Sequence, residues 1–149
     1  MPKKATIERA RRDKRAGKAA STQAGEFVRE EIEAIRKGEH GARSTKQAIA
    51  IGLSKARRAG VKLPVPDEGS VPEETRRKAM QDLRKGQKTP NARPSRKRSQ
   101  ATLKALRREG RSAASKEALS RQARAAARKR SPAERSAAAK KAARTRESG

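Results

Sequence analysis

The sequence has no cysteine and almost no aromatic side chains. Its 149 residues include no Cys, Trp or Tyr and a single Phe. A chain without cysteine has neither a disulfide framework nor a thiolate metal site. The lack of aromatic residues excludes stacking platforms for single-stranded nucleic acid and, on the same ground, an RNA-recognition sheet.

Large apolar side chains and long hydrophobic runs are also scarce. Leu, Ile, Val and Phe together number 16, about 11% of the chain. A highly charged sequence with less than roughly 20% of these residues is usually disordered. No apolar run is long enough for a signal peptide or for a membrane span. We therefore expect a soluble cytoplasmic protein with a small core and no contact with a membrane.

Positive charge is present in large excess, and it is unevenly distributed. The chain has 42 Lys and Arg against 16 Asp and Glu, a formal net charge of +26. Residues 87–149 hold 20 basic and 4 acidic residues, whereas residues 21–69 hold 9 basic and 7 acidic residues. Ten of the 16 large apolar residues lie between Phe27 and Val65. The segment 21–69 is therefore the part that we expect to fold.

Within this segment the pattern predicts a hairpin of two helices. Residues 22–37 form an amphipathic helix, because Val28, Ile32 and Ile35 recur at helical spacing. A second helix starts at Ser44, which forms a capping box with Gln47, and it ends at 59–60. Its apolar stripe consists of Ala48, Ile49, Gly52, Leu53 and Ala56. The small residues of the stripe allow the first helix to approach closely, with Phe27 or Ile32 filling the gap.

The segments on either side of the hairpin are predicted to contribute little to its core. Residues 1–20 are interpreted as a basic arm with helical tendency from 7 to 16, and not as a packed helix. Residues 70–86 predict a short isolated helix that opens with a capping box of Ser70 and Glu73 and stops at Gly86.

The remaining residues, 87–149, form a basic tail rich in Ala, Lys and Arg. A linker covers 87–95, and three stretches with helical composition follow at 100–109, 112–130 and 132–146, the last opened by a capping box of Ser131 and Glu134. Repulsion between like charges opposes helix in free solution. We therefore predict an all-α fold with a short hairpin, isolated helices, and long disordered or conditionally helical basic segments.

No residue pattern predicts catalysis or a bound cofactor. His40 is the only histidine, and we expect it to be an exposed loop residue without the partners that a metal site needs. Glu30, Glu31 and Glu33 are placed on a solvated helix face, which leaves no carboxylate pair for acid–base chemistry. No glycine-rich phosphate loop is present. The sequence therefore predicts a protein that is not an enzyme and that holds no metal and no cofactor.

A cationic tail of this kind is typical of a nucleic-acid-binding protein. It gains free energy by lying along a polyanion and releasing condensed counterions. The tail residues expected to contact phosphate are Arg96, Lys97, Arg98, Lys104, Arg107, Arg108, Arg121, Arg124, Arg128, Lys129, Arg130, Lys140, Lys141, Arg144 and Arg146. Three further candidates lie on the second hairpin helix: Lys46, Arg57 and Arg58.

Duplex DNA, bound with little sequence preference, is the predicted partner of these residues. Two alternatives stay open at this point. In the first, the hairpin is a protein-interaction module that docks on a partner protein, or on a second copy of itself through its apolar stripe, and the tails only add charge. In the second, the chain is an RNA- or ribosome-associated protein.

Residues 38–66 read GEHGARSTKQAIAIGLSKARRAGVKLPVP. This string resembles the motif RSxKQAIAIGLSxARRAG of a family of small, basic bacterial proteins, with a close match from Arg43 to Val61. Such proteins are often labelled as DNA-binding or plasmid-stabilisation proteins, so the resemblance implies a DNA-binding function. The tail from Arg135 to Arg146 is similar in composition to the tails of linker histones and histone-like proteins. That similarity implies the same partner and a place in the nucleoid.

Overall fold

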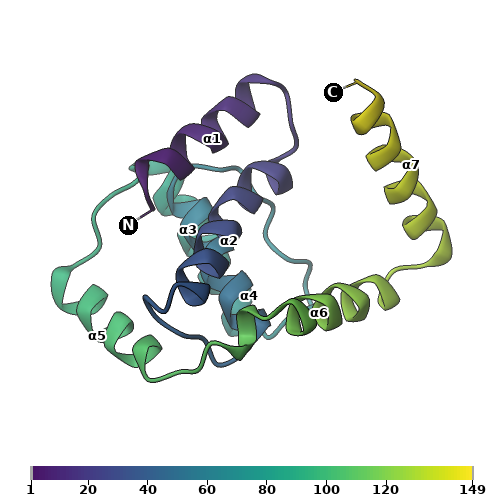
Figure 1. Ribbon diagram of the computed structural model, residues 1–149. Helices are drawn as coiled ribbons and strands as arrows, with labels where there is room; N and C mark the ends of the chain where they lie inside the picture. Colours follow the sequence, from purple (N-terminus) through teal and green to yellow (C-terminus); the bar gives the residue numbers. More distant parts are fainter. Residues whose placement is uncertain (1, 149) are drawn as a thin grey trace. The chain divides into compact units, whose positions relative to one another are not determined.

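The protein is all-α in the computed structural model, which describes residues 2–148 (Figure 1). These residues form seven α-helices and one short 3₁₀ helix, and they contain no β-strand. The helices are α1 (Lys4–Arg15), α2 (Ala20–Arg36), α3 (Thr45–Arg58), α4 (Glu73–Lys88), α5 (Arg96–Arg107), α6 (Lys116–Arg128) and α7 (Pro132–Ser148), and the 3₁₀ helix η1 is Ser112–Ala114. The chain divides into two compact units, one ending at Ala114 and the other beginning at Ser115.

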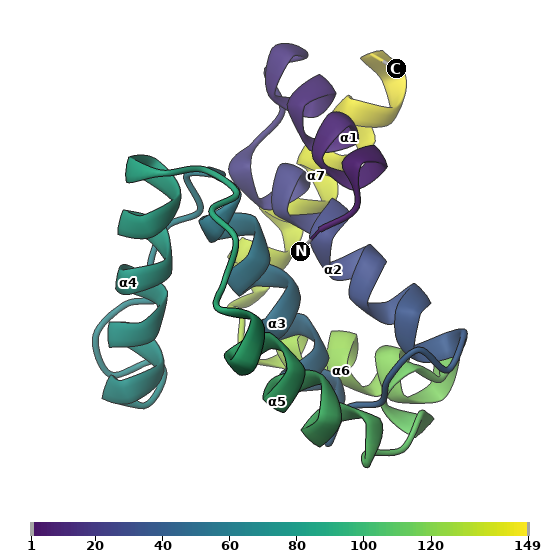
Figure 2. The same ribbon diagram turned by 90° about the vertical axis from the view of Figure 1, so that its left-hand side faces the viewer.

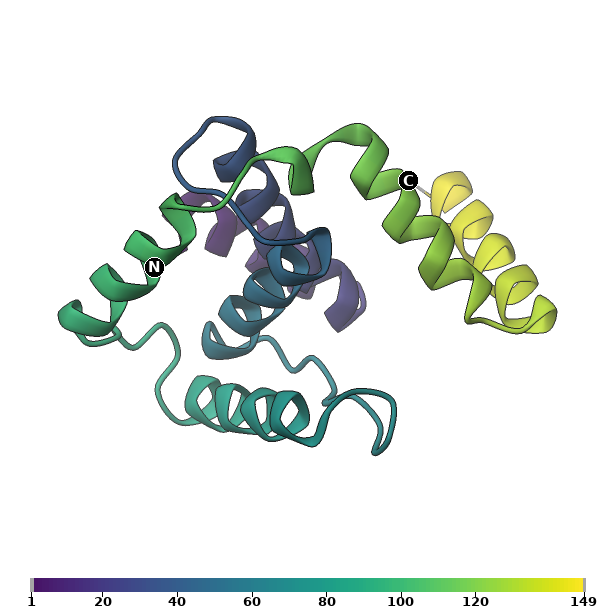
Figure 3. The same ribbon diagram turned by 90° about the horizontal axis from the view of Figure 1, so that it is seen from below.

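Within the first unit, helices α1 to α4 form a bundle in which each helix packs on its neighbour in the chain. Helix α2 contacts α1 and α3, and α3 contacts α4 (Figures 2 and 3). Phe27 and Ile35 are the largest fully buried apolar side chains. Most of the other buried positions around Phe27 are alanines: Ala10, Ala24 and Ala56. Small side chains of this kind let helix backbones approach closely, so the bundle is built with few large residues.

The predicted hairpin of α2 and α3 is confirmed, including its close approach. Only the Ser44 half of the predicted capping box forms, because Gln47 Oε1 accepts the backbone N–H of Arg43, at 2.6 Å, and not that of Ser44. Ser44 Oγ accepts the backbone N–H of Gln47 at 3.1 Å, as expected for the residue that opens α3. Gly52 is buried, and a Cβ built on it would lie 2.6 Å from Val28 Cα. Val28, rather than Phe27 or Ile32, therefore faces the glycine across the helix pair.

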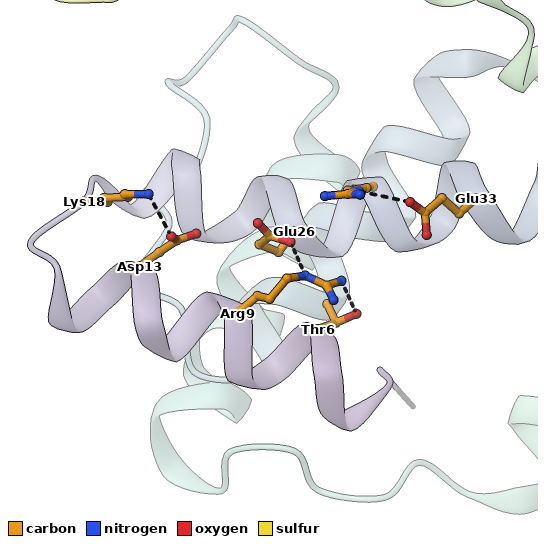
Figure 4. Close-up of polar contacts among 7 residues, drawn as sticks. Thr6, Arg9, Asp13, Lys18, Glu26 and Glu33 are labelled. Atoms are coloured by element: carbon orange, nitrogen blue, oxygen red, sulfur yellow. Dashed lines mark hydrogen bonds and ion pairs between the residues drawn. The ribbon is translucent and has the colours of Figure 1, made fainter. Parts of the chain in front are cut away.

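The prediction of an unpacked N-terminal arm is wrong, because α1 packs along α2 (Figure 4). Thr6, Ala10 and Asp13 of α1 are buried. Arg9 Nε donates a hydrogen bond to Glu26 Oε2 of α2 at 2.7 Å, and Lys18 Nζ lies 3.2 Å from Asp13 Oδ1. Alanine and short polar side chains form most of this contact face, and Ile7 is the one large apolar residue of α1 that packs against the core. The segment therefore lacks the repeated large apolar residues that mark a packed helix in a sequence.

Helix α4 also differs from the isolated helix that the sequence predicts. It packs on α3 and continues through Gly86 to Lys88. Gly86 is buried, and a Cβ there would overlap the carbonyl oxygen of Arg57. The glycine is therefore a point of close helix contact and not a stop signal. Pro72 occupies the N-cap position without a side-chain cap, and Ser70 Oγ instead donates to the Asp67 carbonyl at 2.6 Å.

The prediction of long disordered basic segments is wrong for the described residues, because they form α5, η1, α6 and α7. Local sequence explains why helices form there. Ser95, Ser115 and Ser131 each accept a backbone N–H three residues further on, at 3.1 Å in every case. N-terminal caps of this type stabilise a helix by about 1 kcal/mol each, and Ala, Arg and Lys are strong helix formers. Residues 87–114, predicted as part of one tail, lie in the first compact unit.

Candidate nucleic-acid interface

Three carboxylates of the bundle, Glu26, Glu31 and Asp82, pair with basic groups of a neighbouring helix. Glu31 of α2 is 1% exposed. Its Oε1 accepts a hydrogen bond from the ammonium group of Lys55 on α3, and its Oε2 lies 3.2 Å from His40 Nε2. The side chain of His40 is only 9% exposed. The predictions of an exposed His40 and a solvated Glu31 are therefore wrong: the two residues form a buried charge cluster that ties the α2–α3 loop to both helices.

Asp82 and Glu30 have comparable structural roles. Asp82 of α4 is buried, accepts a hydrogen bond from Ser54 Oγ at 2.6 Å, and lies 3.7 Å from Arg58 Nε. Glu30 is also buried, contrary to prediction, and accepts the backbone N–H of Lys3 at 3.0 Å. Both carboxylates thus join one helix of the bundle to another segment.

Among the three glutamates predicted on a solvated face, only Glu33 remains substantially exposed. Arg29 Nε donates to Glu33 Oε1 at 3.0 Å, and this hydrogen bond holds the pKa of Glu33 below its ordinary value. On the same side of the bundle, the hydrogen bond to Glu26 raises the pKa of Arg9 (Figure 4). Paired carboxylates of this kind do not compensate cations elsewhere on the surface.

The three candidates on α3 differ in their availability to a ligand. Arg57 is 6% exposed, and its Nη2 donates to the Pro64 carbonyl at 2.8 Å. Burial lowers the pKa of Arg57 below its ordinary value. This arginine therefore anchors the segment after α3 and is withdrawn from the phosphate-binding set. Arg58 is half-buried beside Asp82, whereas Lys46 is exposed.

All fifteen candidates of the predicted tail are exposed. In and beside α5 all of them except Arg98 lie on one face. With 3.6 residues per turn, Arg96, Lys97, Gln100, Lys104, Arg107 and Arg108 fall within an arc of about 120°. We call these six residues the α5 cationic face. Leu106, which is buried, points about 140° away from the centre of this face, whereas the half-buried Leu103 lies beside Arg96 at the margin of the face. Arg96–Arg107 contains no carboxylate.

The second unit has two further cationic helices with different charge distributions. On α6, Arg121, Arg124 and Arg128 recur at i, i+3 and i+7 and therefore line one face. On α7 the basic residues are distributed around the whole circumference. Two exposed cations of this unit, Lys116 and Arg135, were not among the predicted contacts. Their charge and their position within the helical stretches were the only sequence features that indicated them.

A set of long-range contacts holds the C-terminal end of α5 against the bundle. The backbone N–H of Gly41 donates to the Leu106 carbonyl at 2.9 Å, and that of Ala42 donates to the Gly110 carbonyl at 3.0 Å. Thr45 Oγ1 donates to the Ala113 carbonyl at 2.7 Å. A Cβ on Gly41 would overlap the Glu109 carbonyl oxygen, so the chain requires glycine here. We call residues 41–45 the clamp loop.

The described residues lack two particular structural features. Residues 2–148 contain no group of three or more His, Cys, Asp or Glu side chains placed to hold a metal ion. Within the same range, no helix has the length and apolar character needed to cross a membrane.

A comparison with known protein families finds a match to part of the chain. A family of unknown function (DUF6496) matches residues 3–66, less than half of the chain. No curated protein and no solved structure matches the chain significantly. The matched segment contains α1, α2, the clamp loop and α3. It therefore covers the residues that hold α5 in place, but not α5 itself or the other cationic helices.

Proposed function

We propose that the protein is a non-enzymatic, nucleoid-associated DNA-binding protein that binds duplex DNA with little sequence preference by neutralising its phosphates. One observation carries the proposal: the helices from residue 96 onward present exposed cations with few carboxylates near them in sequence. Helix α5 has five basic and no acidic residues, and α6 has four basic and one acidic residue. Several acidic residues of the bundle instead pair with basic residues of the bundle itself, among them Glu26, Glu31 and Asp82.

Phosphate neutralisation supplies the binding free energy through counterion release. A protein that contacts about 6–10 phosphates loses roughly 10³–10⁵-fold in affinity between 50 and 200 mM salt. The cations of this chain lie on capped helices, so less conformational freedom is lost on binding than for an unstructured tail. Contacts of this type position a protein on a duplex without reading its sequence.

The arrangement of α3 favours this proposal over a dimerising interaction module. Ala48, Gly52 and Ala56 are buried against neighbouring elements of the same chain. Leu53 packs on the core around Phe27. Most of the apolar stripe is therefore used within one chain, which leaves little apolar surface for a second copy.

The test measures the affinity of the full chain for random duplex DNA across 50–200 mM salt. Replacing Arg121, Arg124 and Arg128 on α6 with Gln should lower the magnitude of the salt slope by about 2.7, since each phosphate contact contributes about 0.9. Replacing three exposed arginines of α1, Arg11, Arg12 and Arg15, removes the same charge from the bundle and should change the slope little. Circular dichroism confirms that both variants fold.

Three results would count against the proposal. A flat salt dependence of the unmodified chain excludes binding through phosphates. An equal effect of the two triple variants shows that net charge, and not the helices from α5 onward, governs binding. Tighter binding to RNA of equal length, measured by competition, would favour the RNA-associated alternative.

A further inference from the structure

Helix α5 is held away from the packed bundle and is exposed along almost its whole length. Figures 1 and 3 show it standing clear of α1, α3 and α4. Of its 12 residues only Leu106 is buried. An isolated helix of about 12 residues is marginal in water, and no other helix packs along this one. A helix presented in this way has most of its surface free for a partner outside the chain.

The attachment of α5 fixes its direction while leaving its cations free. The clamp loop accounts for three hydrogen bonds to residues 106–113, at 2.9, 3.0 and 2.7 Å. Arg36 Nε adds a fourth, to the Ala114 carbonyl at 2.9 Å. Leu106 is buried on the side of the helix opposite to the α5 cationic face, so that face is directed outward.

We propose that α5 docks in the major groove of B-form DNA through its cationic face, with the clamp loop fixing its orientation. This inference rests on the proposed function and names the element that enters the duplex. At 1.5 Å per residue the helix is about 18 Å long and about 10–12 Å across. The B-DNA major groove is about 12 Å wide and admits a helix of this size. The major groove of A-form RNA is too narrow for side chains to read.

The order of residues around the α5 cationic face matches the two walls of a groove. Arg96 and Arg107 lie at one edge of the face, and Lys104, Lys97 and Arg108 lie at the other. Each edge reaches the phosphates of one strand. Gln100 lies in the middle, where a side chain meets base edges rather than phosphates.

The first experiment compares two single variants of the same helix in the full chain. Lys104 lies on the α5 cationic face, whereas Arg98 lies outside it. Lys104→Gln should lower the magnitude of the salt slope on B-form DNA by about 0.9, the contribution of one phosphate contact. Arg98→Gln removes a candidate phosphate contact outside this face and should lower the slope by clearly less than Lys104→Gln does. On double-stranded RNA of equal length, neither variant should change the slope.

The second experiment tests the clamp loop. Gly41→Ala should displace the segment 106–110 and weaken binding to B-form DNA by at least as much as Lys104→Gln does. In the Gly41→Ala background, Lys104→Gln should have little further effect, because the helix is no longer held in the groove. The matched control is Gly25→Ala, whose new Cβ meets no atom within 4 Å. It should leave both the affinity and the effect of Lys104→Gln intact.

The outcomes separate this inference from the proposed function. If the unmodified chain shows no salt-dependent binding to duplex DNA, both fail. If it binds with the expected salt dependence while Lys104→Gln and Arg98→Gln behave alike, α5 does not dock through its cationic face and only the inference fails. An equal loss on DNA and double-stranded RNA, or additive effects of Gly41→Ala and Lys104→Gln, also overturns it.

Discussion

Replacing Gly52 with alanine should destabilise the bundle, although alanine is the better helix former. A Cβ at this position would lie 2.6 Å from Val28 Cα and 2.9 Å from Val28 N. Both are backbone atoms of α2, so a rotamer change cannot relieve the overlap. The two helices must move apart, which loosens the contacts of Ala48 and Ala56 on the same stripe.

Two opposing terms set the size of the effect. Alanine in place of glycine inside a helix stabilises by about 0.5–1 kcal/mol, whereas overpacking a close helix contact costs about 1–3 kcal/mol. The net expectation is a loss of about 1–2 kcal/mol in the free energy of unfolding, or several degrees in Tm for a unit of this size. Leucine adds more volume and should cost more than alanine.

Gly25→Ala is the matched control, because Gly25 is also inside a helix but has open space around it. This variant should gain the helix-propensity term alone. Urea denaturation followed by circular dichroism gives the sign of each change, with an unchanged m-value showing that the transition is comparable. If Gly52→Ala raises the unfolding midpoint as Gly25→Ala does, the close contact between α2 and α3 is not present.

Two further predictions concern the buried charges. Glu31→Gln leaves Lys55 and His40 without their carboxylate and should lower the free energy of unfolding by about 3 kcal/mol. The matched control, Glu33→Gln, breaks an exposed pair with Arg29 and should lower it by less than about 1 kcal/mol. Equal losses in urea denaturation would contradict the buried cluster. Arg57→Gln removes the donor of the Pro64 carbonyl and should cost about 1–3 kcal/mol, while the salt slope of DNA binding at low temperature stays as in the unmodified chain. A slope reduced by one phosphate contact would instead place Arg57 at the interface.

The sequence predicts the α2–α3 hairpin because its determinants are local. The periodic apolar residues of α2 lie within α2 itself. The Ser44 cap and the small residues around Gly52 lie within or directly beside α3, so each helix can be read from its own sequence. The exposed tail cations are predictable for the same reason, since a lysine or arginine without an apolar neighbourhood is seldom buried.

The packing of α1, the clamp loop and the buried charges could not be predicted, because they depend on contacts between distant segments or on residues without a strong sequence pattern. Helix α1 packs through Ala10 and Thr6, which leave no apolar periodicity. The clamp loop needs glycine at position 41 because of a carbonyl 68 residues away, at Glu109. Glu31 and Arg57 are charged residues, which a sequence alone predicts to be exposed. Their burial is explained by their hydrogen-bond partners in the folded chain, Lys55 for Glu31 and the Pro64 carbonyl for Arg57.

The separation of carboxylates in the bundle from cations on the later helices connects the fold to the proposed function. Large apolar residues are too few to bury much surface, and carboxylates such as Glu31 and Asp82 contribute contacts between helices in their place. A carboxylate buried in this way is not available at the surface. There it would pair with exposed lysines and arginines and compete with the phosphates of DNA for them. The helices from α5 onward have almost no such partners, and their positive potential is therefore left uncompensated. Introducing a carboxylate on the α5 cationic face with Lys97→Glu should lower the affinity for DNA more than Lys97→Gln does. Both variants lose one phosphate contact, but the glutamate also repels the phosphates. Measuring both variants at one salt concentration tests this, and equal affinities would show that the local potential of α5 does not act on the duplex.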